Sequence, residues 1–153
     1  MFRRFKFEKD LYETLEFIPL AVRRKFDLCR IRLSLRQWQQ LGQAERLAIC
    51  HFPVNLEEER EALRAFVREA VKRSSGEEVE MLPESDKPAS DLPAEPPARL
   101  VENAKAVGVE LTKALWDKLD ADERYALIKL GAGEKVSHNF AIAIKEFQEA
   151  YAS

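Results

Sequence analysis

The chain has 153 residues, 46% of them hydrophobic, which is enough for one globular domain or two very small ones. Its 25 Lys and Arg nearly balance 27 Asp and Glu, and a net charge of −2 argues against binding driven by electrostatic attraction to DNA. Residues 1–36 hold ten basic and five acidic side chains, a local +5, whereas 77–95 hold seven acids and one Lys, a local −6. This asymmetry fits either steering of an acidic partner or an ordinary solvated surface.

No stretch resembles a signal peptide, and no run approaches the roughly 18 apolar residues of a membrane span. Cys29 and Cys50 form no CxxC pair, so their spacing indicates neither a disulfide framework nor a zinc knuckle. We therefore expect a cytoplasmic protein in a reducing compartment, without membrane contact.

The N-terminal half, residues 1–73, is predicted to begin with an extended arm whose apolar side chains cover part of the core. A first helix is expected from about Pro19 to Cys29, and a second, capped by Ser34, ends near Leu41. Gly42 offers a weaker cap to a third helix. A fourth starts at Asn55 and has an apolar stripe of Leu63, Phe66, Val67, Ala70 and Val71.

Five of the seven prolines lie in the segment from Ser74 to Pro97, together with Ser, Gly and acidic residues. Such a segment cannot bury enough apolar surface to offset its ordering entropy. The sequence therefore predicts a flexible linker over 74–97.

The C-terminal half, residues 98–153, repeats the same order of helix signals. A helix from about Pro97 to Val107 stops at Gly108, and Thr112 caps a short helix that ends near Leu119. Asp120 and Glu123 form a capping box for a third helix, and Ser137 precedes a fourth. The stripe of this fourth helix consists of Phe140, Ile144, Phe147 and Tyr151.

The two halves align at an offset of 78 residues, which indicates an internal repeat. We therefore predict an all-α fold in which two pseudo-symmetric four-helix halves pack into one compact domain. The identical pairs are Leu33/Leu111, Trp38/Trp116, Leu41/Leu119, Glu45/Glu123, Arg46/Arg124 and Ala48/Ala126.

Few side chains are suited to chemistry. Cys29 and Cys50 are expected in the core rather than at a metal, and the Gly-Ala-Gly at 131–133 lacks the strand of a nucleotide loop. We expect no catalytic residue, metal or cofactor, and not an enzyme. Trp38 and Trp116 are expected to pack in the core rather than stack on a ligand.

The repeated Glu-Arg pairs allow two interpretations. Glu45–Arg46 and Glu123–Arg124 could form ion pairs across the pseudo-symmetry axis. In the alternative, each Glu caps a helix and each Arg is solvated.

The stretch from Phe17 to Leu35, followed by Trp38, resembles the nitrate reductase-associated protein family. The second half is similar to that family at Gly108–Thr112, Trp116, Arg124–Leu130, and His138–Phe140 leading to Glu146-Phe147. The opening Phe5-Lys-Phe-Glu8 agrees as well. The chain departs from the family pattern at Arg30, where relatives carry Gly, and at Gly42, where relatives have a better cap.

The resemblance implies a helper in nitrate assimilation with nitrate reductase as its protein partner. The expected role is non-catalytic binding during maturation or activity of the enzyme. The alternative is a helical regulatory or nucleic-acid-binding module, although the acidic linker and near-neutral charge make nucleic acid a poor partner. The sequence is compatible with a homo-oligomer.

Polar residues inside the family-like motifs suggest a partner-binding surface, and the alternative is that they cap helices and bridge the halves. If the surface binds reductase, charge reversal at Arg23 and Lys25 should weaken binding in a pull-down while helical content and melting stay unchanged. The predicted surface comprises Arg23, Arg24, Lys25, Asp27, Lys129, His138 and Asn139.

Overall fold

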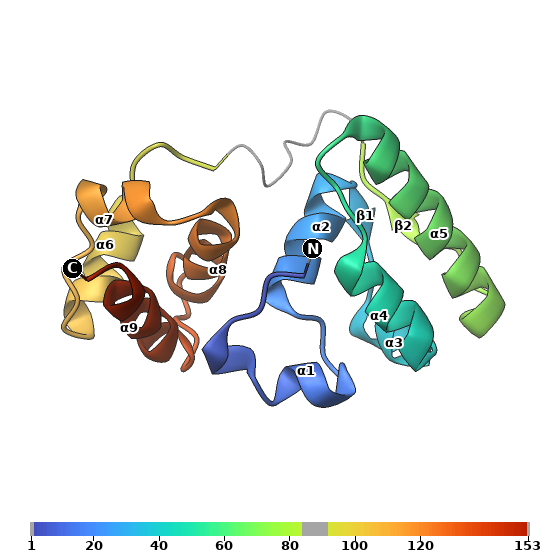
Figure 1. Cartoon of the computed structure of the whole chain (residues 1–153), viewed down its shortest axis with the longest axis horizontal. Coiled ribbons are helices and arrows are strands. Elements are labelled where there is room, and N and C mark those ends of the chain that lie inside the picture. The colour runs from blue at the N-terminus through green and yellow to red at the C-terminus, as the bar shows by residue number, and fades with distance from the viewer. Residues whose placement is uncertain (1, 84–91, 153) are drawn as a thin grey trace. The chain divides into compact units, whose positions relative to one another are not determined.

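The computed structural model describes residues 2–83 and 92–152, and most of them lie in helices (Figure 1). The helical class predicted from the sequence is therefore confirmed. The chain divides into two compact units. Among the described residues, unit 1 holds 2–4 and 8–83, and unit 2 holds 5–7 and 92–152.

Within the described part of unit 1, one short helix of four residues is followed by four longer helices, which agree with the four predicted from the capping signals. α5 packs against α3 and α4, and α2 packs against α4. The predicted apolar stripe on α5 is buried at Leu63, Val67, Ala70 and Val71, all 0% exposed, whereas Phe66 is half-buried against the core. The helices are α1 (Leu11–Thr14), α2 (Leu20–Leu28), α3 (Leu35–Gln40), α4 (Gln43–His51) and α5 (Glu57–Ser75).

The N-terminal segment is not the extended arm that was predicted. It forms the 3₁₀ turn η1 (Lys6–Glu8) and then the short helix α1. Both are too short for hydrophobic periodicity to be visible in a sequence. The apolar residues nevertheless pack as expected in part, because Phe5 is buried and Phe2 contacts the unit 1 core.

Unit 1 also contains a small antiparallel sheet that the sequence pattern did not predict. Strand β1 (Ile31–Arg32) pairs with β2 (Glu80–Met81), and Leu82 N donates a hydrogen bond to Arg30 O at 2.8 Å. Two-residue strands carry no alternating pattern, so only the structure reveals them.

The sheet shortens the predicted linker of residues 74–97. α5 continues to Ser75, and Val79 is only 6% exposed within the unit 1 core. The central part of the predicted linker, 84–91, lies outside the described residues. Its predicted flexibility stays a prediction.

Within the described part of unit 2, four helices follow one another in the predicted order. α8 packs against α6 and α9, and α7 packs against α9. The stripe of α9 is buried at Phe140, Ala143, Ile144 and Phe147. The helices are α6 (Ala98–Ala106), α7 (Lys113–Lys118), α8 (Ala121–Gly131) and α9 (Phe140–Tyr151).

Trp38 and Trp116 are fully buried and make equivalent hydrogen bonds in the two units. Trp38 Nε1 donates to Leu15 O at 2.8 Å, and Trp116 Nε1 donates to Pro93 O at 3.1 Å. Each acceptor lies 23 residues before its indole. A buried ring with a bonded N–H is a core residue, which agrees with the predicted packing role.

Arg46 and Arg124 bind the carbonyl of the tryptophan eight residues earlier. Arg46 Nε donates to Trp38 O at 3.1 Å, and Arg124 Nε donates to Trp116 O at 3.0 Å. Arg46 also donates to Leu15 O, which Trp38 already contacts. Both arginines are half-buried, so the expectation that they are solvated is corrected. A guanidinium is suited to this position because its fixed fork of N–H groups reaches several carbonyls at once.

The glutamates before these arginines cap helices, as one of the two interpretations held. Glu45 Oε1 accepts from Gly42 N, and Glu123 Oε1 accepts from Asp120 N, both at 2.9 Å. Asp120 completes a reciprocal capping box through Glu123 N at 2.8 Å, whereas Gly42 has no side chain to do so. Glu123 is 2% exposed and also accepts from the Tyr151 hydroxyl.

The cap at Gly42 should make folding stability depend on pH. The Gly42 amide, helped by Arg73 at 2.8 Å, holds the pKa of Glu45 below its usual value of 4.5. A lowered folded-state pKa stabilises the fold above the unfolded value, and this stabilisation is lost as pH falls through the folded value. We expect Glu45→Gln to reduce stability at neutral pH and to flatten the decline below pH 4.5. Urea unfolding at a series of pH values measures both.

Glu61→Gln, on the exposed side of α5, is the matched control and should leave the pH profile unchanged. Equal profiles for wild type and Glu45→Gln would contradict the role of this cap.

Candidate functional site

α2 carries four of the predicted partner-binding residues, and a buried carboxylate fixes its N-terminus. Glu8 Oε2 accepts from Leu20 N at 3.0 Å, and Glu8 Oε1 accepts from the Tyr12 hydroxyl at 2.8 Å. Glu8 is 8% exposed, and its negative charge faces the positive end of the helix. Local capping patterns could not reveal it, because Leu20 lies 12 residues further along the chain.

The four predicted residues on α2 differ in exposure. Arg23 is exposed, and its Nε donates to Ile18 O at 3.4 Å. Arg24 and Asp27 are half-buried. Lys25 is buried, on the same side of α2 as Val22 and Phe26. Only Arg23 is therefore openly presented to solvent.

Lys25 holds the C-terminal end of α4. Its Nζ donates to Cys50 O at 2.5 Å, to Phe52 O at 2.7 Å and to Ile49 O at 3.4 Å. These carbonyls belong to the end of a helix, where intrahelical donors run out and a positive charge is favourable. The expectation that Lys25 faces a partner is corrected: it is 6% exposed and caps a helix, as the alternative interpretation held.

The other three predicted residues lie in unit 2, at the end of α8 and in the turn before α9. Lys129 is exposed, and its Nζ lies 5.5 Å from the centre of the Tyr125 ring. His138 is exposed, and Asn139 is half-buried immediately before Phe140. Ser137 acts at the start of α9 as predicted, because its hydroxyl accepts from Asn139 N at 3.2 Å.

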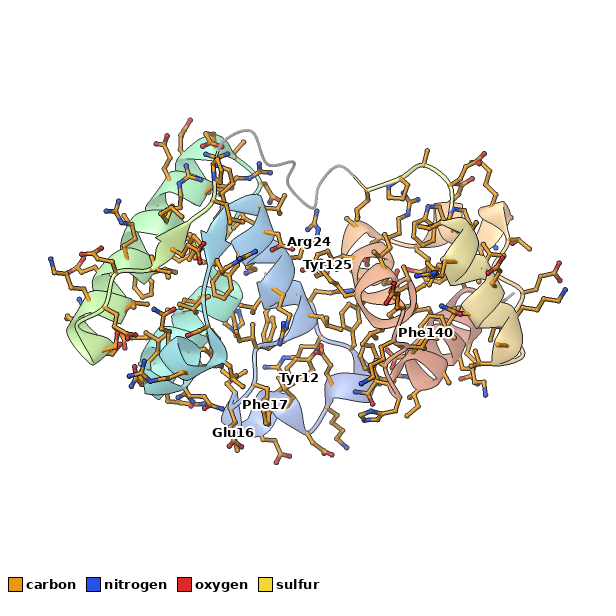
Figure 2. All side chains as sticks on the ribbon, turned by 180° about the vertical axis from the view of Figure 1, so that it is seen from behind. Tyr12, Glu16, Phe17, Arg24, Tyr125 and Phe140 are labelled. Atoms are coloured by element: carbon orange, nitrogen blue, oxygen red, sulfur yellow. The ribbon has the colours of Figure 1, made fainter. Side chains whose placement is uncertain are left out.

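Tight packing fixes the base of the α8–α9 turn. A Cβ added to Gly131 would lie 2.2 Å from the Phe140 ring, so the two helices approach closely only because residue 131 is glycine. Phe140 is fully buried among the side chains of unit 2 (Figure 2). Asn103 Nδ2 donates to Gly131 O at 2.6 Å. Asn103 therefore holds the end of α8, as Lys25, 78 residues earlier, holds the end of α4.

Exposed apolar side chains occur in and just after the α8–α9 turn, close in sequence to His138 and Asn139. Ser137 N donates to Leu130 O at 2.9 Å, so the turn folds back onto the last turn of α8. Val136 is 42% exposed and Ile142 is 56% exposed. Ile142 lies off the buried stripe of α9. An apolar residue outside such a stripe indicates an exposed apolar side chain, and this signal is present in the sequence. We name as the turn patch the residues Lys129, Val136, His138, Asn139 and Ile142.

Arg23, Arg24 and Asp27 belong to unit 1, whereas the turn patch belongs to unit 2. The first three lie on consecutive turns of α2, and the turn patch residues lie at the end of α8, in the α8–α9 turn and at the start of α9. The combination of the two groups into one surface stays a prediction.

Neither cysteine has the environment of a reactive thiol. Cys29 and Cys50 are both free and 0% exposed, and burial raises the pKa of each thiol to about 11. Since the thiolate is the nucleophile and metal ligand, both thiols are inert near neutral pH.

Across residues 2–83 and 92–152, no three His, Cys, Asp or Glu side chains gather as they would around a metal ion. In the same residues, no helix has the length and apolar character needed to cross a membrane.

The family model described as conserved nitrate reductase-associated protein matches residues 4–147. The chain belongs to this family. No curated protein and no solved structure matches the chain.

The backbone explains one departure from the pattern of nitrate reductase-associated proteins. Arg30 has a φ of 56°, in the left-handed region, where relatives are expected to carry glycine. Gly108, 78 residues later, has a φ of 84° in the corresponding position after α6. Glycine adopts this conformation without steric cost, whereas the Cβ of Arg30 is strained there.

The capping role of Lys25 predicts a stability effect that a surface lysine would not show. Lys25→Met removes the donor to three carbonyls and is expected to lower the free energy of unfolding by about 1–3 kcal/mol. Lys25→Glu should lower it further, because an unpaired carboxylate would be buried beside carbonyl oxygens. Urea unfolding followed by circular dichroism measures both.

Arg23→Met, on the same helix, is the matched control and should change stability by less than about 0.5 kcal/mol. Equal stability for the variants at positions 23 and 25 would contradict the capping role.

Proposed function

We propose that this chain is a non-catalytic accessory protein of assimilatory nitrate reductase, acting by protein–protein binding in the maturation or activity of the enzyme. The observation that carries the proposal is the family match, which extends over residues 4–147. The family description names association with nitrate reductase and no reaction of its own. We further propose that the protein acts in the cytoplasm.

The environment of the titratable groups supports a binding role rather than a catalytic one. Both thiols are buried, with their pKa raised to about 11. Glu8, Lys25 and Glu123, the charged side chains that the fold buries in its described part, hold the ends of helices. Such groups are committed to the fold and are poorly placed to serve as an acid or base.

We infer that the two units are copies of one helical module. Three kinds of contact and one backbone conformation support this inference at an offset of 78. The contacts are the indole bond to a preceding carbonyl, the arginine bond to the tryptophan carbonyl and the glutamate cap. The conformation is that of the left-handed residue after the first helix. The indole bond spans 23 residues and the arginine bond spans eight, so local helix propensity produces neither.

The two units differ in the length of the connection before their last helix, and this difference supports our proposal for the partner surface. The connection between α4 and α5 is residues 52–56, five residues, whereas that between α8 and α9 is residues 132–139, eight residues. The additional length falls in the turn that presents Val136 and His138. Loops on a rigid scaffold are where binding residues concentrate, and exposed apolar side chains rimmed by polar ones are typical of protein interfaces. We therefore propose the turn patch as the reductase contact, with Arg23, Arg24 and Asp27 as a second group.

The test is a binding measurement between the tagged chain and purified nitrate reductase, preceded by a pull-down from nitrate-grown cells. We expect the wild type to recover reductase. Ile142→Asp places a charge in the turn patch and should weaken reductase binding by at least about tenfold, the effect of losing one interface anchor.

Leu56→Asp is the matched control, because Leu56 is 58% exposed and lies outside the turn patch, at the start of α5. It should bind reductase like the wild type. Equal binding by both variants would remove the turn patch from the proposal, and failure of the wild type to bind reductase would overturn the accessory function itself.

A further inference from the structure

Glu146 and Phe147 of α9 form a seat that is occupied by residues 5–7 of the same chain. The Glu146 carboxylate accepts two consecutive backbone N–H groups, from Lys6 at 3.0 Å and from Phe7 at 2.9 Å. A carboxylate that accepts two amides at the start of a 3₁₀ turn makes charge-assisted bonds to the main chain alone. This part of the recognition therefore does not depend on which side chains the bound segment carries.

Aromatic contacts add side-chain selectivity to the seat. The Phe5 and Phe7 rings are stacked, with centres 5.4 Å apart and planes at 10°. The Phe147 ring lies 5.4 Å from Phe5 and 6.2 Å from Phe7. Phe5 is 2% exposed, whereas Lys6 between the two rings is exposed. The bound pattern is thus Phe-x-Phe, with a solvent-facing residue in the middle.

Separate contacts hold the residues on either side of this tripeptide. Phe2 packs edge-on against Tyr12 and His51, and the Arg4 guanidinium lies 5.4 Å from the ring centres of Phe2 and Tyr12. On the other side, Glu8 binds Tyr12 and Leu20. All of these residues belong to unit 1, whereas residues 5–7 belong to unit 2. The flanking contacts do not use the seat, so the tripeptide can leave it without loss of either anchor.

We propose that the seat on α9 is a peptide-binding site for a Phe-x-Phe segment of a partner protein, and that residues 5–7 are its intramolecular occupant. A partner segment of this pattern takes over the two amide bonds to Glu146 and the ring contacts with Phe147. The tethered occupant has a high effective concentration and lowers the apparent affinity for the partner segment. The inference goes beyond reductase binding and does not require the turn patch.

The probe is a fluorescein-labelled peptide of residues 3–9, Arg-Arg-Phe-Lys-Phe-Glu-Lys, and the readout is fluorescence anisotropy with the full chain. Phe5→Ala/Phe7→Ala removes the ring contacts of the tethered segment and leaves only its amide bonds, so this variant should bind the peptide at least about tenfold more tightly than wild type, whose complete segment competes. Adding Glu146→Gln should weaken that binding about tenfold or more, because the amide loses the charge-assisted pair. A peptide with both Phe replaced by Ala should not bind.

Lys6→Pro weakens the binding of the tethered segment without removing buried rings, and Lys6→Ala is its matched control. Lys6→Pro deletes one of the two N–H groups that Glu146 accepts, whereas Lys6→Ala retains it. Position 6 is exposed, so neither substitution removes a buried side chain. Lys6→Pro should bind the labelled peptide more tightly than wild type, and Lys6→Ala should equal wild type. Absence of peptide binding by folded variants would overturn the proposal. Loss of the fold in both Phe5→Ala/Phe7→Ala and Lys6→Pro would also overturn it, because the tripeptide would then be an inseparable part of the core.

Discussion

Short helices impose the constraint on which the rest of this structure depends. A helix leaves four N–H groups and four C=O groups without intrahelical partners, and α3 and α7 are only six residues long. Most of their backbone groups must therefore bond to something outside the helix. Side chains from other positions supply these partners: Arg46 donates to the carbonyl of Trp38 in α3, and Arg124 donates to the carbonyl of Trp116 in α7. Lys25 completes the end of α4 and Glu8 the start of α2 in the same way.

This constraint changes how the charged residues of such a chain should be interpreted. A polar side chain within a family motif suggests a binding role, yet Lys25, Arg46 and Arg124 are used to complete helix ends. Replacing them would disturb the fold before any partner is involved. A contact surface is better sought among exposed side chains that no helix end requires. Ile142, which is 56% exposed beside a turn longer than its counterpart, is one of them.

The sequence was most informative where the determining interaction is local. Ser34, Thr112 and Asp120 accept from amides three residues ahead, so their caps can be seen in a short window. The tryptophans were placed in the core because their helical spacing repeats. Lys25 and Glu146 could not be assigned in this way, because their partners lie 24 to 27 and 139 to 140 residues away. β2 could not be predicted, because its two residues lie in a polar segment and form a strand only by pairing with β1.

For the candidate site, the motifs identified Lys129, His138 and Asn139. The exposure of each side chain in the structure was needed to add Val136 and Ile142 and to remove Lys25.

The seat on α9 also has a consequence for the order of events during synthesis. The ribosome makes Phe5, Lys6 and Phe7 about 140 residues before it makes Glu146. At roughly 5–20 residues per second, the nascent chain carries two phenylalanines without their final contacts for on the order of ten seconds. Unit 1 can complete its own core during that interval, since its described residues end at position 83. Residues 5–7 are thus among the first to be made and among the last to reach their native contacts.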